Sequence, residues 1–250
     1  MKVTRIYRLI LSRTALLGFI SVGVLSMHQH AVAEVRGPEV LIDDHFEREE
    51  SSDLLEEVGN GWETNSKKRA KGEKQVDLVG GALKIYRAET ADHGVSVTHE
   101  ASFSDAVISL RFQLGVGDDL GINIADMQEK SVHAGHLFVA RVRLNQLEVT
   151  DLKTGRMNLE RRTRRQSGNE TKEDQAINDR TTQKRPIQLA ANQWHEMEVR
   201  IEDDQMNVTI NGEMIIAFRS EGIAHPTKSR LRLSVNRNAW VDDVKLIKLN

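Results

Sequence analysis

The chain has 250 residues, with 35 basic and 37 acidic side chains and no cysteine. Residues 34–250 contain 31 basic and 37 acidic residues, a net charge of −6, which argues against a general nucleic-acid binder. The lack of cysteine excludes thiol catalysis, cysteine-based metal sites and disulfide bridges, so the fold must depend on its hydrophobic core.

Residues 1–33 predict a cleaved secretory signal peptide. A basic start is followed by an apolar stretch at 15–27, and Ala31-Val32-Ala33 has the small-x-small form of a cleavage site. The apolar stretch is shorter than the ~20 residues that a helix needs to cross a bilayer. We therefore expect a secreted or periplasmic protein without a membrane anchor after cleavage. The remainder, 34–250, suits one β-sandwich domain, which we expect to be a monomer.

The first half of this domain predicts short antiparallel strands, because apolar and polar residues alternate between turn signals. The expected strands are 41–42, a hairpin of 76–79 and 83–86, then 95–99, 106–114, 121–125, 136–144 and 146–152. Trp62 is expected in a glycine-rich turn at 59–62. No helix is predicted between these strands, and this arrangement favours a sandwich.

Residues 156–185 differ in kind and predict a surface insertion. They hold nine basic and five acidic residues but only four apolar ones, too few to form a core face. We expect either disorder or two short surface helices at 160–165 and 172–178, the second preceded by a weak capping box of Thr171 and Asp174. The arginine run at 161–165 suits a solvated surface or a contact with an acidic polysaccharide.

The last quarter, from Trp194 to Asn250, predicts a β-meander. Alternating strands at 195–202, 206–210 and 214–218 surround Asn211-Gly212, a dipeptide typical of a type I′ hairpin turn. Closing strands are expected at 229–235 and 244–249, separated by a turn at 236–243. Trp240 then lies beside a turn.

Several motifs carry a family likeness that covers nearly all of residues 34–250. They are Gly59-Asn60-Gly61-Trp62, Ala91-Asp92-His93-Gly94-Val95, Val132-His133-Ala134-Gly135-His136-Leu137, Asp151-Leu152-Lys153-Thr154-Gly155, Gly222-Ile223-Ala224-His225-Pro226-Thr227-Lys228 and Val241-Asp242-Asp243-Val244. With these motifs the chain resembles exported proteins of planctomycete-type bacteria that are similar to the 3-keto-disaccharide hydrolase family. The resemblance implies an all-β fold, an antiparallel β-sandwich of the concanavalin A-like jelly-roll type, whose concave face meets carbohydrate.

Ordinary retaining glycosidase chemistry is disfavoured by the sequence. Laminarinase-like glycosidases with this fold use Glu-x-Asp-x-x-Glu, whose carboxylates share one strand face, and no such spacing occurs in this chain. A 3-keto sugar can instead be cleaved by elimination, because its ketone acidifies the neighbouring C–H. A histidine base, alone or with a metal, would then suffice.

The candidate catalytic residues under this hypothesis are His93, His133, His136 and Asp126. On a regular strand, His133 and His136 would point to opposite faces, but Gly135 permits a turn that brings them together. Asp126 is close enough in sequence to orient a ring or to add an oxygen ligand. The alternative is that these residues only stabilise turns.

Two further types of site are open. Trp62 and Trp240 are candidates for stacking on a sugar ring, or else belong to the core. Asp44 and Asp242 lie in aspartate pairs where the first and last strands should meet, which suits a calcium site or simple turn hydrogen bonds.

The expected function is therefore glycan recognition or processing, with hydrolase or lyase activity on 3-keto-glycosides implied by the resemblance alone. The alternative class is a non-catalytic module that binds carbohydrate or cell-surface material.

Overall fold

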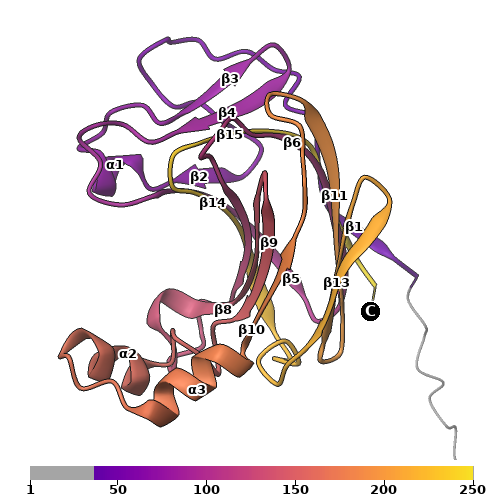
Figure 1. Ribbon diagram of the computed structural model, residues 1–250. Helices are drawn as coiled ribbons and strands as arrows, with labels where there is room; N and C mark the ends of the chain where they lie inside the picture. The colour runs from indigo at the N-terminus through magenta and orange to yellow at the C-terminus, as the bar shows by residue number, and fades with distance from the viewer. Residues whose placement is uncertain (1–36, 250) are drawn as a thin grey trace, which may run out of the picture. The chain divides into compact units, whose positions relative to one another are not determined.

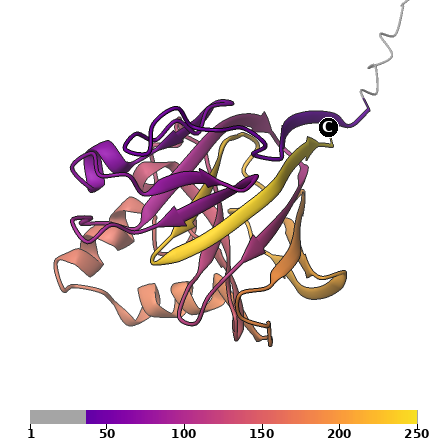
Figure 2. The same ribbon diagram turned by 90° about the horizontal axis from the view of Figure 1, so that it is seen from above.

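The computed structural model describes residues 37–249 and shows two antiparallel β-sheets packed face to face (Figures 1 and 2). This confirms the predicted all-β sandwich. The predicted signal peptide at 1–33 lies outside the described residues. Among those described, no helix combines the length and the apolar character needed to cross a bilayer.

The eight-stranded sheet contains the predicted meander. Its order is β13(Glu213–Arg219), β12(Gln205–Ile210), β11(Trp194–Glu202), β6(Ala106–Gln113), β15(Asn238–Lys248), β4(Ala82–Tyr86) and β3(Val76–Val79), with β1(Glu39–Asp44) also paired to β15. Asn211 and Gly212 have φ values of 50° and 79°, as the type I′ turn requires.

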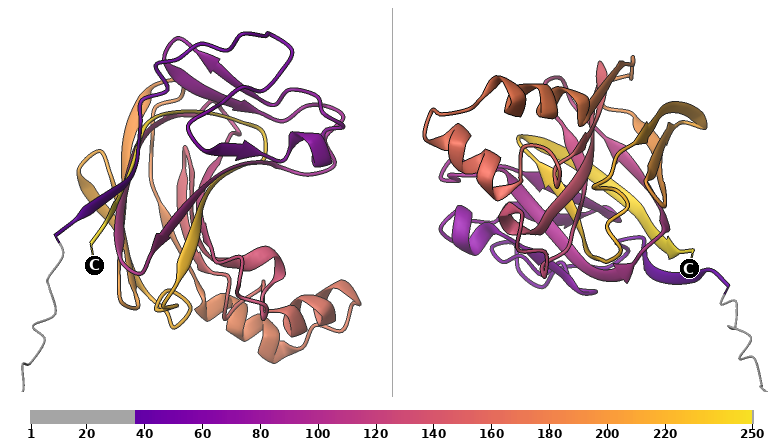
Figure 3. Two further views of the ribbon diagram at one scale, coloured as in Figure 1. Left: turned by 180° about the vertical axis from the view of Figure 1, so that it is seen from behind. Right: turned by 90° about the horizontal axis from the view of Figure 1, so that it is seen from below.

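The seven-stranded sheet carries the other face of the sandwich. Its order is β10(Thr182–Pro186), β9(Gln146–Asp151), β8(His136–Arg143), β7(Leu120–Ala125), β14(Lys228–Val235), β5(Val95–Phe103) and β2(Trp62–Thr64). Figure 1 shows this sheet curving between α1(Ser66–Arg69) on one side and α2(Leu159–Gln166) with α3(Lys172–Arg180) on the other. The two views of Figure 3 show the same arrangement from behind and from below.

The core forms between the sheets because every second residue of each strand turns inward. On β6, Ile108, Leu110 and Phe112 are buried while the residues between them are only partly covered. The same alternation on β14 buries Leu231 and Leu233 and leaves Arg230, Arg232 and Ser234 on the outward face.

The charged insertion contains both expected helices. Asn158 caps α2, because its side chain accepts a hydrogen bond from the Arg161 N–H. Thr171 and Asp174 form a complete capping box at the start of α3. The 182–186 end of the segment pairs with β9 as β10, a strand that the sequence did not predict, because its side chains are too polar to reveal half-burial.

Of the two closing strands, β14 agrees with the predicted 229–235, whereas β15 begins earlier than expected. The expected turn at 236–243 is largely strand, since β15 runs unbroken from Asn238 to Lys248 and absorbs Asp242 and Asp243 in a β-bulge. Asp243 has a φ of 51°, a conformation that aspartate tolerates both in turns and in β-bulges. The aspartate pair therefore has the composition of a turn although it lies inside a strand. Trp240 is consequently a strand residue.

Candidate functional site

A groove of about 440 Å³ runs along the outward face of the seven-stranded sheet. Its floor comes from β5, β7, β8 and β14, and one wall comes from 156–166 of the insertion. An adjoining recess of about 520 Å³ extends toward α1 and shares His93, His133, His136 and Arg232 with it. These volumes are within the range of small-molecule sites, roughly 300–1,000 Å³.

Strand register explains which side chains reach the floor. Arg232 on β14 pairs with Thr98 of β5 and with Asn123 of β7, so these three polar residues form one row across the sheet. The neighbouring row contains Ser96, Ser234, Gly121 and Arg141. Gly121 leaves room for the arginine, because a Cβ there would lie 2.7 Å from Nη2 of Arg141.

A tight turn brings His133 and His136 together. Ala134 and Gly135 have φ values of 51° and 69°, and the two imidazole centroids lie 6.4 Å apart with an interplanar angle of 28°. A Cβ on Gly135 would lie 2.4 Å from the carbonyl oxygen of Asp126, so only glycine fits this close approach. The turn that the sequence allowed is therefore present.

A β-bulge completes the orientation of His136. Ala125 pairs with His136 and Ile124 with Phe138, which leaves Leu137 as the extra residue. On a regular strand, residues two apart share a face, so without the bulge His136 would lie on the same face as Phe138, which is buried in the core. The bulge turns the imidazole outward to the groove.

His136 is held as a neutral imidazole. Nη1 of Arg232 lies 3.0 Å from each ring nitrogen, and Nδ2 of Asn123 lies 3.0 Å from Nδ1. Burial, together with the charge of Arg232, lowers the pKa of His136 to about 3. At neutral pH the ring therefore accepts hydrogen bonds.

His133 lies closer to the opening of the groove and is only partly buried. Burial followed by the positive charge of Arg162 lowers the pKa of His133 from its usual value near 6.5. This ring is also neutral at neutral pH, and it keeps more basicity than His136.

Two arginines on the floor are fixed by neighbouring groups. Arg141 forms an ion pair with the buried carboxylate of Asp119, and its Nη2 donates a 2.9 Å hydrogen bond to Oγ of Ser234. Burial lowers the pKa of Arg232 to about 10, so this guanidinium remains charged at neutral pH. The floor thus presents fixed positive charge beside two neutral histidines.

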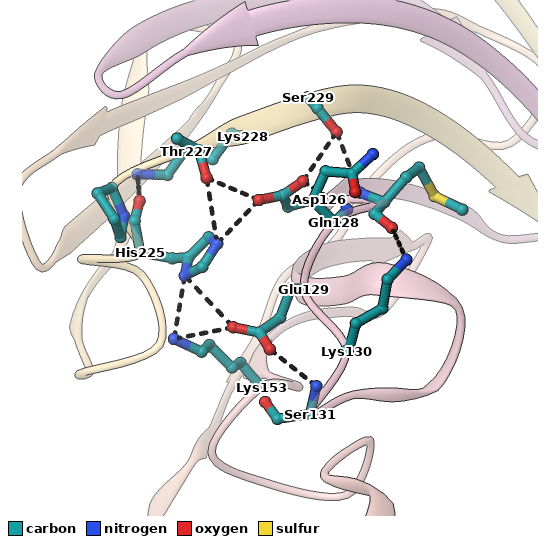
Figure 4. A network of polar contacts seen from close by, with 12 residues as sticks. Asp126, Gln128, Glu129, Lys130, Ser131, Lys153, His225, Thr227, Lys228 and Ser229 are labelled. Atoms are coloured by element: carbon teal, nitrogen blue, oxygen red, sulfur yellow. Dashed lines mark hydrogen bonds and ion pairs between the residues drawn. The ribbon is translucent and has the colours of Figure 1, made fainter.

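Asp126 does not line the groove, and its side chain belongs to a separate network of polar contacts (Figure 4). Its Oδ2 accepts hydrogen bonds from Thr227 Oγ1 at 2.6 Å and His225 Nε2 at 3.1 Å, and its Oδ1 accepts one from the Gln128 N–H at 2.9 Å. Burial alone raises the pKa of Asp126, but these hydrogen bonds outweigh it and lower the pKa to about 2. The Asp126 N–H donates to the Gly135 carbonyl at 2.9 Å, so the network anchors the histidine turn.

The other side of this network is also satisfied. Nζ of Lys153 donates to Nδ1 of His225 at 3.0 Å, so Nδ1 accepts and the Nε2–H donates to Asp126. The Glu129 carboxylate lies 3.7 Å from Nζ of Lys153 and accepts from the Ser131 N–H at 2.8 Å. We therefore assign Asp126 to positioning, outside the groove itself.

The structure brings together three of the four candidate catalytic residues. His93, His133 and His136 line the same groove, whereas Asp126 lies in the network behind the histidine turn. His93 is exposed at the rim, where its Nδ1 lies 3.0 Å from the Gly94 carbonyl oxygen.

Neither candidate tryptophan lines the groove. Trp62 is buried, its Nε1 donates to Oδ2 of Asp44 at 2.8 Å, and its ring packs against Phe46 and His99. Trp240 lies on the outer face of the other sheet, under Nζ of Lys84 at 5.5 Å. Trp62 matches the core alternative, whereas Trp240 is half-buried outside the core and away from the groove.

The aspartates proposed for calcium lie at the expected junction, since β1 pairs with the end of β15. Their oxygens are, however, already engaged. Arg48 binds both carboxylate oxygens of Asp44 at 2.7 and 3.0 Å, and Asp242 lies 3.4 Å from Nη1 of Arg111. Within residues 37–249 no group of three or more histidine or acidic side chains is arranged to hold a metal. Asp44 and Asp242, as they are arranged, do not fit a calcium ion.

Sequence reasoning missed Arg232, Arg141 and Asn123. The available signal was the alternation Arg230-Leu231-Arg232-Leu233-Ser234, which places two cations on one outward strand face. Alternation does not tell which outward face becomes the groove, because that depends on sheet order and on where the insertion folds.

Solved structures with similar folds are jelly-roll glycosidases. The laminarinase from Rhodothermus marinus is 12% identical with a TM-score of 0.56 and covers 86% of this chain and 100% of its own. The laminarinase catalytic domain from Thermotoga maritima is 11% identical with a TM-score of 0.53, covering 85% and 99%. SCLam, a non-specific endo-β-1,3(4)-glucanase of family GH16, is 12% identical with a TM-score of 0.56, covering 85% and 92%. This likeness establishes the jelly-roll fold.

A family model described as a 3-keto-alpha-glucoside-1,2-lyase-like domain matches residues 50–246, which include every groove residue named above. A comparison with curated protein sequences finds no significant match.

Proposed function

Because the chain belongs to the family of 3-keto-α-glucoside-1,2-lyase-like domains, we propose that it cleaves 3-keto-glycosides by elimination in this groove. One observation supports the proposal above all: two neutral histidines lie beside a fixed, charged arginine on the groove floor. A base and a cation next to each other are what the removal of a proton beside a ketone requires.

The chemistry follows from the ketone at C3 of the sugar. A base removes the proton at C2, and the electrons of that C–H bond form the C1=C2 double bond. The bond between C1 and the glycosidic oxygen breaks, and the leaving oxygen takes a proton. The products are a free alcohol or sugar and an unsaturated 3-keto sugar, and no water molecule is consumed.

His133 is the base in this proposal. Its lowered pKa keeps the ring unprotonated at neutral pH, and its place nearer the opening leaves it accessible to a sugar. His136 is a weaker base, with a pKa of about 3, and its ring nitrogens already face Arg232. We therefore assign His136 to holding the arginine and the neighbouring ring in place.

Arg232 stabilises the negative charge that develops on the ketone oxygen as the C2 proton leaves. A fixed cation in a partly desolvated groove can lower such a barrier by several kcal/mol, since it needs no reorganisation during the reaction. Asn123 on the neighbouring strand contacts His136, and His136 contacts Arg232. These contacts limit the movement of the Arg232 side chain. With the predicted signal peptide, the proposal extends to a substrate met outside the cytoplasm.

Direct glycoside hydrolysis fits this groove less well. Retaining and inverting glycosidases need two carboxyl groups across the scissile bond. Among the described residues that line the groove, none is an aspartate or a glutamate. Aromatic side chains are also absent from that set, which disfavours a binding module that stacks sugar rings.

The test is incubation of the protein with 3-keto-trehalose and, as the matched control, with trehalose itself. We expect glucose release from the 3-keto sugar only, together with ultraviolet absorption from the conjugated enone. A substrate deuterated at C2 should lose its deuterium to solvent. Glucose release with C2 deuterium retained would show direct hydrolysis instead. No release from either sugar, with retention on a polysaccharide column, would favour the binding module.

A further inference from the structure

The groove carries more positive charge than cleavage of a neutral sugar requires. Besides the three histidines, five arginines line it: Arg141, Arg156, Arg162, Arg165 and Arg232. The whole chain has a formal net charge of −2, so this concentration of cations is local. Such a concentration is costly unless something of opposite charge binds there.

Only part of this charge is neutralised within the protein. Arg141 is paired with Asp119. Arg162 donates to the neutral amide oxygen of Gln166 at 2.7 Å, and Nη1 of Arg165 donates to the Arg156 carbonyl at 3.0 Å. Of the carboxylates in residues 37–249, none forms an ion pair with Arg156, Arg162 or Arg165.

Helix α2 separates paired from unpaired arginines by its own periodicity. Arg161 and Arg164 are three residues apart, share one face, and both meet the Asp174 carboxylate, at 3.9 and 2.5 Å. Arg162 and Arg165 are also three residues apart and line the groove instead. The helix thus directs one pair of guanidinium groups toward α3 and the other pair toward any ligand.

Arg156 lies between this helix and the floor. It lines the groove and also an adjoining recess, whose charged residues are Arg165, Lys184, Glu148 and Asp179. Desolvation lowers the pKa of Arg156, the negative charge of Glu148 opposes that shift, and the like charges of Arg141 and Arg165 add to it. A bound anion would relieve that repulsion, and the planar guanidinium group matches carboxylate and sulfate oxygens in a bidentate geometry.

We propose that Arg156, Arg162 and Arg165 form a subsite for an anionic substituent, a carboxylate or a sulfate, on the part of the substrate that leaves. This inference rests on the proposed elimination for the identity of the reacting sugar. The 3-keto ring lies over His133 and Arg232, and the leaving group extends toward α2. The substrate class is therefore an acidic 3-keto-glycoside.

The test compares three 3-keto-α-glucosides that differ only in the aglycone: phenyl, 4-carboxyphenyl and 4-sulfophenyl. We expect kcat/KM to be about ten- to a hundred-fold higher for at least one anionic substrate, the range of charge-assisted hydrogen bonds. The carboxylate arm and the sulfonate arm, in which the sulfonate stands in for a sulfate, identify which anion the subsite prefers. The advantage should shrink as salt is raised, since these charges face solvent.

The variant R162Q/R165Q should remove most of that advantage, measured as the ratio of kcat/KM for the anionic substrate to kcat/KM for the phenyl substrate in the same variant, because loss of the Arg162 charge also raises the pKa of His133 and alters both rates together. The matched control is R161Q/R180Q, which removes two charges from the same insertion outside the groove, and it should keep the preference. Melting temperatures of both variants check folding. Equal kcat/KM for all three substrates in the unaltered protein would overturn the subsite.

Binding separates this inference from the proposed function. Calorimetry with the unoxidised 4-carboxyphenyl, 4-sulfophenyl and phenyl α-glucosides needs no turnover. Tighter binding of an anionic glucoside, lost in R162Q/R165Q, supports the subsite even if no 3-keto-glucoside is cleaved, an outcome that would remove the elimination proposal alone. Equal, weak binding of all three would overturn the subsite whether or not elimination occurs.

Discussion

The protein contains two clusters of histidine and charged residues that lie on opposite sides of one short turn. In the Asp126 network, His225 meets a carboxylate on one ring nitrogen and Lys153 on the other, at 3.1 and 3.0 Å. In the groove, His133 and His136 stand among arginines, and no described acidic side chain lines the space. The residue types are similar, but the network pairs Lys153 and His225 with carboxylates, whereas the groove is lined by cations without carboxylates.

The difference shows how a structural polar cluster can be told from a functional one. Every charged partner in the Asp126 network is satisfied within the protein, so its contribution is to hold segments that are about a hundred residues apart in sequence. The groove leaves neutral rings and unpaired guanidinium groups facing solvent, and these need a ligand to balance them.

The largest expected effect is a loss of cleavage rate on substitution in the groove, which substitution in the Asp126 network should not cause. His133→Gln should lower the rate of 3-keto-trehalose cleavage by about 10²–10⁴-fold, the usual contribution of a general base, with little change in melting temperature. The rate is measured by enone absorption. His225→Gln is the matched control, and we expect it to lower stability while the folded fraction remains active. Equal losses of rate in both variants would contradict the distinction.

A second substitution tests the fixed cation. Arg232→Gln should lower the cleavage rate by about 10²–10³-fold, because the charge on the ketone oxygen loses its stabilising partner. Arg232→Lys should recover part of that loss, since lysine restores the charge but lacks the planar guanidinium group whose Nη1 contacts both ring nitrogens of His136. The rate follows from the same enone assay. An unchanged rate in Arg232→Gln would remove this residue from the chemistry.

A third substitution acts on the satisfied cluster. Asp126→Asn should lower the free energy of unfolding by about 1–3 kcal/mol at pH 7, through weakened hydrogen bonds to Thr227 and His225. The folded-state pKa of Asp126, about 2, lies below its usual 3.8, so the stability that its charge contributes is present above pH 3.8 and is lost between pH 3.8 and 2. Urea unfolding at pH 7 and at low pH measures the difference, which should shrink on acidification.

The smallest effect is a shift in a pH profile. Because the pKa of His133 is lowered, the neutral base persists below pH 6.5, and kcat/KM should begin to fall only on further acidification. A profile of kcat/KM between pH 4 and 8 shows the pH at which this fall begins. An acid limb at or above pH 6.5 would indicate a different base or a protonated partner.

Much of the fold could be predicted because strand alternation and turn chemistry are local. Asn211-Gly212, the 76–86 hairpin and the meander all appear where their residues indicated. The prediction for 236–243 was wrong because a β-bulge at Asp242 and Asp243 has the composition of a turn. Strand β10 was not predicted because its formation depends on pairing with β9, which lies about thirty residues earlier in the chain.

The candidate site was predictable only in part. Gly135 between two histidines signalled a turn, and His93 shared their family motifs, so three groove residues could be named in advance. The arginines could not, because Arg232 comes from a closing strand and Arg156 from the insertion. Only the tertiary arrangement shows that these residues face the same space.

The insertion has one further consequence for how specificity can change. β9 and β10 are direct neighbours, with Thr150 paired to Thr182, so the intervening helices leave and return at the same edge of the sheet. Under the proposed function, the base and its neighbouring cation sit on the turn and strands of the sandwich, whereas Arg156, Arg162 and Arg165 of the proposed anionic subsite sit on this excursion. Exchanging this helical segment would therefore alter the proposed anionic subsite while leaving His133 and Arg232 in place, although the charge of Arg162 also contributes to the lowered pKa of His133.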